Sequence, residues 1–133
     1  MKRPSHAGLR HVALNVIDLE CMERFYTDIL GFKLEWRPDA DNVYLCSGVD
    51  SLALHRVQDA SRADLQALDH IGIIINDIGD VTLWYDYMKE HGVTLHNKAK
   101  THRDGARSYY CADPEGNNIQ IIFHPPISGK KVL

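Results

Sequence analysis

The sequence of 133 residues is short of the features that mark membrane-spanning, secreted and disulfide-rich proteins. No apolar run approaches the ~20 residues that a membrane span needs. The polar N-terminus has no hydrophobic segment of the kind found in a signal peptide. Cysteine is scarce, with three residues and no CxxC pair, which excludes a disulfide framework or a zinc knuckle. Reduced thiols in a cytoplasmic protein are therefore expected.

The sequence also lacks a large excess of positive or negative charge. The net charge is −3, the pI is near 6.2, and the one basic cluster is the short tail around Lys130 and Lys131. This balance gives no reason to expect a nucleic acid or an anionic membrane as partner. With 44% apolar and 25% charged residues, the composition is that of one globular domain spanning 1–133.

The chain contains one pattern twice. The segment "LRHVALNVIDL" (9–19) aligns with "LDHIGIIINDI" (68–78), so that His11 falls on His70. Further along, "VYLCS" aligns with "YYCA", and "SLALH" aligns with "NIQII". A unit of roughly 60 residues is thus repeated, which indicates a duplicated supersecondary structure. The two units span 9–57 and 68–125, and the polar linker 58–67 joins them.

Each unit is expected to fold as β-α-β-β-β. Residues 9–16 alternate between apolar and polar, which is typical of a strand. Asp18 is a natural N-cap for a helix that runs to about Leu30 and stops at Gly31. The fold class is therefore α+β, with two tandem βαβββ units forming a cupped, antiparallel or mixed sheet around a central cleft. The other expected elements are strands 32–37, 42–47 and 51–57, then strand 69–75, helix 78–91 closed by Gly92, and strands 93–97, 106–112 and 118–124.

The alternation also assigns the two faces of each sheet. Branched aliphatic residues belong under the helix, which leaves His11 and His70 on the other face beside the small residues Ala13 and Gly72. This open face also carries residues from the last two strands of the units. They are Ala53, His55, Ser108, Tyr110, Gln120, Ile122 and His124.

The duplicated units and the segments "HVALNVIDLECMERFYTDILGF", "DHIGIIINDI" and "YYCADPEGNNIQII" resemble the vicinal oxygen chelate superfamily. The resemblance extends from about Leu9 to Pro125. It implies a cupped sheet around a divalent metal ion (Zn, Ni, Mn, Fe or Mg), often completed in a homodimer. The metal-ligand positions of the superfamily fall on His11, Ala53, His70 and Gln120.

Two of these four positions depart from a full ligand set. Ala53 cannot coordinate, which resembles the three-ligand branch of the superfamily. Gln120 stands where such sites have a glutamate, and its amide is too poor a proton acceptor to serve as general base. The predicted metal ligands are therefore His11, His70 and Gln120, and the catalytic groups are expected among Tyr110 and His55.

Substrate binding is predicted for Ser108 on the open face and for Arg103, Arg107 and His124 at its edge. Arg103 and Arg107 lie in the polar loop "THRDGARS" (101–108), where they can hold an anionic group or be solvated. His124 is the outermost of these substrate-binding candidates, and its alternative role is that of an exposed residue at the rim of the cleft.

Two functions remain open. The first is a metal-dependent enzyme on a small oxygen-rich molecule, with a lyase or isomerase and an extradiol-type dioxygenase ranked equally. A fosfomycin-type transferase ranks lower, because the sequence has no compact set of cationic residues. The second is a metal-free binding protein of the bleomycin-resistance type. Gln120 and Ala53 favour the binder, whereas His11 together with His70 favours the enzyme.

Overall fold

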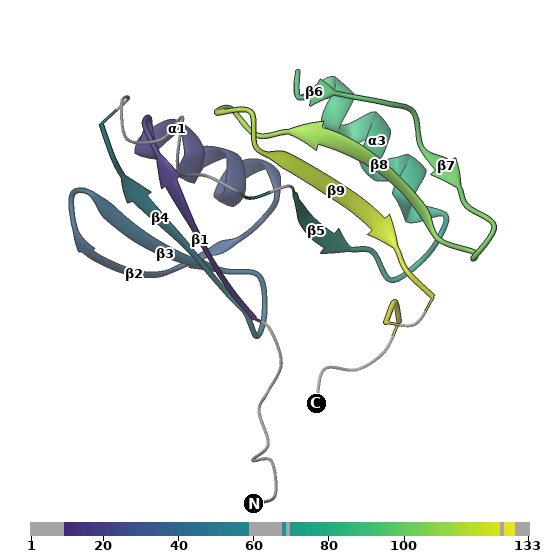
Figure 1. The fold of residues 1–133 in the computed structure, drawn as a ribbon, viewed down its shortest axis with the longest axis horizontal. Coiled ribbons are helices and arrows are strands. Elements are labelled where there is room, and N and C mark those ends of the chain that lie inside the picture. The colour runs from purple at the N-terminus through teal and green to yellow at the C-terminus, as the bar shows by residue number, and fades with distance from the viewer. Residues whose placement is uncertain (1–9, 59–67, 69, 126, 130–133) are drawn as a thin grey trace, which may run out of the picture. The chain divides into compact units, whose positions relative to one another are not determined.

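The computed structural model describes residues 10–58, 68, 70–125 and 127–129. The chain divides into two compact units, Met1–Asp64 and Leu65–Leu133, which are coloured from purple to yellow in chain order in Figure 1. The predicted linker, apart from Gln58, lies outside the described residues. Helices and mixed sheets occur in both units, which confirms the predicted α+β class.

The first unit has the predicted order of a strand, a helical segment and three strands. The strands are ordered β1-β4-β3-β2, with β1 and β4 parallel and the other neighbours antiparallel. Its elements are β1 (His11–Val16), α1 (Leu19–Arg24), the π-helical turn η1 (Phe25–Ile29), β2 (Lys33–Asp39), β3 (Asn42–Cys46) and β4 (Ser51–Arg56).

The helical segment of this unit begins as predicted but ends differently. The carboxylate of Asp18 accepts a hydrogen bond from the backbone N–H of Cys21 at 3.0 Å, which caps the first turn. The last turn is π-helical, because the N–H of Leu30 bonds to the carbonyl of Phe25, five residues earlier. Gly31 follows with a φ of 79°, a left-handed value that glycine adopts without strain.

The second unit repeats this order with one additional short strand. The sheet is ordered β5-β9-β8-β6, with β7 paired to β8, and β5 is parallel to β9. Its elements are β5 (Ile71–Ile74), α3 (Asp80–Glu90), β6 (Thr94–Leu95), β7 (Lys100–Thr101), β8 (Arg107–Ala112) and β9 (Asn118–Phe123).

Side-chain hydrogen bonds explain where this unit differs from the predicted boundaries. Helix α3 begins two residues late, because the carboxylate of Asp77 accepts from the N–H of Gly79 and holds a non-helical turn. Strand β6 is short, because the Oδ1 of Asn97 takes the place of a strand carbonyl and accepts from the N–H of Tyr110 at 2.8 Å. Strand β7 falls at the start of the predicted polar loop, which is therefore a hairpin.

The strand registers place the two copies in equivalent positions. Ala13 pairs with Ala53 in the first unit, and Gly72 pairs with Gln120 in the second. Along the opposite edges of β4 and β9, Tyr44 pairs with Ala53 and Tyr110 pairs with Gln120. The alignment of "SLALH" with "NIQII" is therefore confirmed by the hydrogen-bonded ladders.

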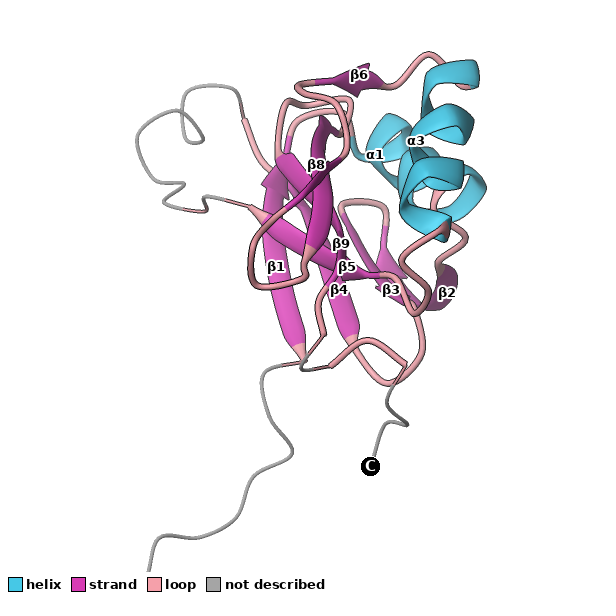
Figure 2. Ribbon diagram, turned by 90° about the vertical axis from the view of Figure 1, so that its right-hand side faces the viewer, coloured by secondary structure: helices cyan, strands magenta, loops and turns pink. Residues whose placement is uncertain are grey.

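Within each unit the helix covers one face of its own sheet. In Figure 1 α1 lies behind β1 and β4, and α3 lies behind β8, and Figure 2 shows the cyan helices beside the magenta strands. The described helices include none that is long and apolar enough to cross a membrane. The helices and sheets bury apolar residues that include Leu14, Val16, Met22, Val43, Leu45, Leu52 and Leu54 in the first unit and Val81, Met88, Tyr109, Cys111, Ile119 and Ile121 in the second.

Candidate functional site

The open face of the second sheet is formed by alternate residues of β8 and β9. Tyr109, Ile119 and Ile121 are fully buried on the helix side. The residues between them therefore point to the opposite face, since successive side chains of a strand alternate. Tyr110 and Gln120 are direct neighbours there, as their pairing in the antiparallel ladder requires.

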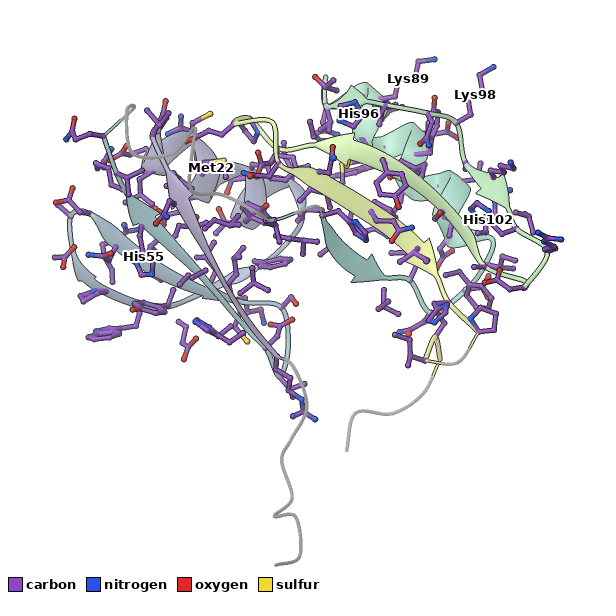
Figure 3. The ribbon with its side chains drawn as sticks, viewed as in Figure 1. Met22, His55, Lys89, His96, Lys98 and His102 are labelled. Atoms are coloured by element: carbon purple, nitrogen blue, oxygen red, sulfur yellow. The ribbon has the colours of Figure 1, made fainter. Side chains whose placement is uncertain are left out.

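Gln120 is oriented by Ser108. The Nε2 of Gln120 donates to the Oγ of Ser108 over 3.4 Å, and this Oγ lies 3.4 Å from the Nε2 of His102. Ser108 is buried, with 4% of its surface exposed, so its hydroxyl is held within the sheet. Because the amide nitrogen faces Ser108, the carbonyl oxygen Oε1 is the Gln120 atom that remains for a ligand. Figure 3 shows His102 at the hairpin of β7 and β8.

His70 lies on the same face, one residue before β5. Its ring meets the ring of Tyr110 edge to face, with centroids 5.5 Å apart and an interplanar angle of 88°. Gly72, two residues along, pairs with Gln120, and a Cβ at this glycine would first meet Ile122 at 4.0 Å. The predicted residues His70, Tyr110, Gln120 and Ser108 are thus brought together by the second unit alone.

A shallow pocket of about 360 Å³ adjoins this cluster. Its lining residues are His96, Asn97, Tyr110 and Asn118. The side-chain Oδ1 of Asn97 is used by the backbone of Tyr110, so the Nδ2 of Asn97 is the group it has left to donate. Sequence reasoning missed His96 and Asn97, because a regular strand was expected to continue through residue 97, and it also missed Asn118 at the start of β9.

The first unit presents His11 on the exposed face of β1. The position equivalent to Gln120 is Ala53, which is fully buried and pairs with Ala13 and Tyr44. A methyl group has no lone-pair donor atom, so of these two equivalent positions in the first unit only His11 could coordinate an ion.

His55 is half-buried on the same face of the first sheet, and Figure 3 shows its side chain over these strands. Its Nδ1 lies 2.6 Å from the Oδ1 of Asn42, and its ring lies edge-on to Tyr44 at 6.0 Å. Tyr44 in turn stacks on Trp36, with centroids 5.5 Å apart and an angle of 24°. Trp36 is 60% exposed. These contacts were not predicted from the sequence.

Arg103, Arg107 and His124 are the other predicted substrate-binding residues. The guanidinium of Arg107 donates to the hydroxyls of Thr101 and Thr82 at 2.9 and 3.1 Å. Because Thr82 belongs to α3, Arg107 points to the helix side of the sheet. Arg103 is exposed in the hairpin turn. The half-buried His124 donates its backbone N–H to the Oγ of Ser128 at 2.7 Å.

Burial sets the protonation of two groups beneath the second sheet. Loss of solvent raises the pKa of the Cys111 thiol to about 12, with a further contribution from the negative charge of Asp113. Burial likewise raises the pKa of the Tyr109 hydroxyl. Both groups are therefore neutral near pH 7 and belong to the core. The three cysteines are free, in agreement with the expected reduced thiols.

The predicted metal ligands comprise two imidazoles and one amide oxygen. His11 comes from the first unit, and His70 and Gln120 come from the second. The described residues contain no group of three or more His, Cys, Asp or Glu side chains that could hold an ion. These residue types suit a divalent ion such as Zn²⁺ or Ni²⁺, since imidazole nitrogen and carbonyl oxygen are both metal ligands. The set contributes no negative charge.

Comparisons with known proteins agree with this architecture. Metallothiol transferase FosB from Staphylococcus haemolyticus is 27% identical over 116 residues, which are 86% of this chain and 81% of that protein. The crystal structure of lactoylglutathione lyase from Agrobacterium tumefaciens superposes with a TM-score of 0.74 at 24% identity, covering 92% of this chain and 96% of that one.

A second solved structure supports the same fold. The glyoxalase/bleomycin resistance protein/dioxygenase from Alicyclobacillus acidocaldarius gives a TM-score of 0.69 at 23% identity, covering 88% of this chain and 91% of that one. The family model described as Glyoxalase/Bleomycin resistance protein/Dioxygenase superfamily matches residues 8–121. The match covers the first copy of the βαβββ unit and most of the second, from before His11 to beyond Gln120. This chain therefore belongs to the glyoxalase/bleomycin resistance protein/dioxygenase superfamily, as its repeated motifs predicted.

Proposed function

We propose that this protein is a divalent-metal-dependent enzyme that acts on a small oxygen-rich molecule chelated through neighbouring oxygens. The observation that carries the proposal is the orientation of Gln120. Its amide nitrogen is held by Ser108, which leaves the carbonyl oxygen on the face that also bears His70 and Tyr110. His11, the equivalent of His70 in the first unit, is the third proposed ligand. The homodimer stays a prediction.

The superfamily supports a metal-dependent reaction. It contains many metal-dependent enzymes, and the relative from S. haemolyticus is named a metallothiol transferase. A bound divalent ion supplies Lewis-acid chemistry, polarising the substrate oxygens that it contacts. Gln120 lacks the full charge of a carboxylate, so an ion held here keeps more of its electrophilic character.

The residues of the open face have distinct proposed roles. The hydroxyl of Tyr110, beside His70, donates to a substrate oxygen and so orients the molecule. Ser108 keeps the amide of Gln120 in one orientation. Gln120 itself moves no proton, because an amide is a very weak base. A lyase or isomerase therefore needs its proton acceptor elsewhere, and His55 of the first unit is the proposed one.

The type of reaction that this site would catalyse is a separate question. A lyase or isomerase and an extradiol-type dioxygenase remain the two proposed chemistries. The relation to FosB adds transfer of a thiol to this set, although the two arginines of the predicted anion-binding loop do not join the Gln120 cluster. One observation favours the metal-free binder instead: the exposed stack of Trp36 on Tyr44 offers a flat apolar surface to a planar ligand.

Metal analysis and thermal shifts test the proposal. Protein purified without added ions is titrated with Ni²⁺, Zn²⁺, Mn²⁺ and Fe²⁺. A ligand at 100 times its Kd stabilises the folded state by about 2.7 kcal/mol, so at least one ion should raise the Tm clearly. His70→Ala should abolish that rise. His91→Ala is the matched control, because His91 is an exposed histidine at the end of α3.

Two results would count against the enzyme. If no ion raises the Tm of the natural protein, the metal proposal is lost and the binding protein is favoured. If the ions act equally on the His70→Ala and His91→Ala variants, they bind outside the proposed ligand set.

A further inference from the structure

Three polar side chains lie in line across the first sheet, from the turn of the β2–β3 hairpin to β4. Asp39 pairs with Asn42 across the hairpin, and Asn42 pairs with His55 across the next ladder. The Nδ2 of Asn42 lies 2.8 and 3.0 Å from the two carboxylate oxygens of Asp39. The Oδ1 of Asn42 lies 2.6 Å from the Nδ1 of His55. The three side chains thus form a continuous hydrogen-bonded chain.

The chemistry of this chain fixes the proton on the histidine ring. An ionised carboxylate only accepts hydrogen bonds, so the Asn42 group that faces Asp39 must be its NH₂. The group that faces His55 is then the carbonyl oxygen of Asn42, which also only accepts. The hydrogen bond to it requires a proton on Nδ1 of His55. A neutral imidazole carries one N–H, so Nε2 holds the lone pair.

The carboxylate at the start of the chain is itself well held. The backbone N–H of Asp41 donates to Asp39 at 2.8 Å. This bond and the amide of Asn42 keep the pKa of Asp39 below its ordinary value, so the carboxylate is ionised near neutral pH. The backbone N–H of Arg56 donates to the carbonyl of Asp41 at 2.8 Å, which ties the hairpin turn to the end of β4.

The second unit has no such arrangement. The residue equivalent to His55 is Ile122, and the residue equivalent to Asn42 is Ser108, as their pairing across β8 and β9 shows. Gln120 is not a base. At these equivalent positions, the contact between an asparagine and a histidine ring is therefore found in the first unit and not in the second.

We propose that Asn42, locked by Asp39, is a positioning residue that holds His55 as the Nδ1–H tautomer and so presents Nε2 as the general base of the reaction. The proposal deepens the proposed function and rests on it. It assigns the substrate to small molecules with an acidic C–H or O–H bond. The proton of that bond passes to the lone pair of Nε2, and the bonding electrons stay on the substrate. The imidazolium keeps its Nδ1–H bond to Asn42 and later returns the Nε2 proton to the product.

Nitrogen NMR of the metal-free protein tests the tautomer directly. Side-chain ¹⁵N shifts and couplings distinguish protonated from unprotonated ring nitrogens of His55 at a pH where the ring is neutral. The natural protein should show Nδ1 protonated and Nε2 bare. Asn42→Ala should convert the ring largely to the Nε2–H form, and Asp39→Asn should give a mixture, because nothing then fixes the amide. Asn15→Ala is the control: Asn15 pairs with His55 across β1 and β4, yet is not a hydrogen-bond partner of the ring in the described part of the chain.

A chemical probe tests whether Nε2 is reachable as an acceptor. Bromoacetate alkylates an unprotonated imidazole nitrogen, forming an N–C bond and releasing bromide. We expect His55 to be carboxymethylated at Nε2 in the natural protein and in Asn15→Ala, and at both nitrogens in Asn42→Ala. An Nε2–H ring in the natural protein, an unchanged tautomer in Asn42→Ala, or an unreactive Nε2 would each overturn the proposal.

These readouts need neither metal nor substrate, so they fail separately from the proposed function. A bare Nε2 combined with no metal-induced Tm shift leaves His55 positioned and removes the metal enzyme. A metal-induced shift combined with an Nε2–H ring keeps the metal enzyme and moves the base to another residue.

Discussion

The two copies of the βαβββ unit share a backbone plan but carry different chemistry at equivalent positions. Both present a histidine at the first strand, His11 or His70. Both also have a tyrosine on the strand that pairs with the last strand, Tyr44 on β3 and Tyr110 on β8. At the last strand they differ. The first copy has Ala53 and the hydrogen-bonded His55, whereas the second has Gln120 and Ile122. The two copies therefore have the same strand registers, but the side chains at the last strand offer different hydrogen-bond donors and acceptors.

In the proposed function, the two copies of the unit have separate tasks, metal binding at Gln120 and proton transfer at His55. Here the amide oxygen of Gln120 and the ring nitrogen of His55 belong to different copies, each fixed by its own neighbour, Ser108 or Asn42. Loss of one group therefore leaves the support of the other intact.

The largest expected effect comes from placing the same new charge in both copies. Ala53→Glu should destabilise the protein by about 3 kcal/mol or more, because Ala53 is fully buried and a carboxylate there has no partner. Gln120→Glu should change the free energy of unfolding by less than about 1 kcal/mol, since Ser108 can donate to the new carboxylate. Urea denaturation of both variants measures the difference. Equal losses would mean that the two positions are not distinct environments.

Metal affinity should respond next. Gln120→Glu adds a full negative charge at a proposed ligand and should tighten Ni²⁺ or Zn²⁺ binding by about tenfold or more, which is about 1.4 kcal/mol. Asn118→Asp is the matched control, because it adds the same charge on the same face two residues away, roughly 7 Å along the strand. Isothermal titration calorimetry compares them. An equal gain from Asn118→Asp would assign the effect to general electrostatics and remove Gln120 from the ligand set.

A smaller effect is expected under the helix of the second copy. Tyr109 occupies the position of Val43, and among the described residues its buried hydroxyl has no hydrogen-bond partner. Tyr109→Phe removes that unsatisfied group and should stabilise the protein by about 1 kcal/mol. Tyr85→Phe serves as control, since this neighbouring ring, 5.2 Å away, is only half-buried. Thermal unfolding distinguishes them, and a destabilised Tyr109→Phe would contradict the expectation.

The smallest effect concerns pH and the first copy alone. The pKa of Asp39 is lowered by the N–H of Asp41 and then by Asn42. A lowered folded-state pKa stabilises the protein above the unfolded value of about 3.9, and this contribution is lost as pH falls through the folded value. The stability difference between the natural protein and Asp39→Asn should therefore shrink below about pH 4. Carboxyl ¹³C titration of Asp39 provides the direct check, and a midpoint at or above the unfolded value would refute it.

Periodicity and the internal repeat predicted the fold because both depend on backbone rules. Alternation of apolar residues assigned the buried faces of β1 and β9, and the Asp18 cap was read from its type and place. Such features follow from local preferences that each residue carries with it.

The remaining features depend on side-chain directions that no periodicity records. The π-helical turn at Phe25, the end of β6 before Asn97 and the chain from Asp39 to His55 each depend on specific hydrogen bonds. Arg107 shows the same limit. A basic residue in a polar loop suggested an anion site, but its guanidinium is bound to α3.

The distribution of tryptophan gives each copy its own fluorophore. Trp36 stacks on Tyr44 in the first unit, and Trp84 lies against Tyr87 in the second, with centroids 5.4 Å apart. They are the two tryptophans of the chain. Variants that keep one or the other report the unfolding of a single copy. Coincident transitions would mean that the two halves unfold as one cooperative body, and separated transitions would mean that each half unfolds on its own.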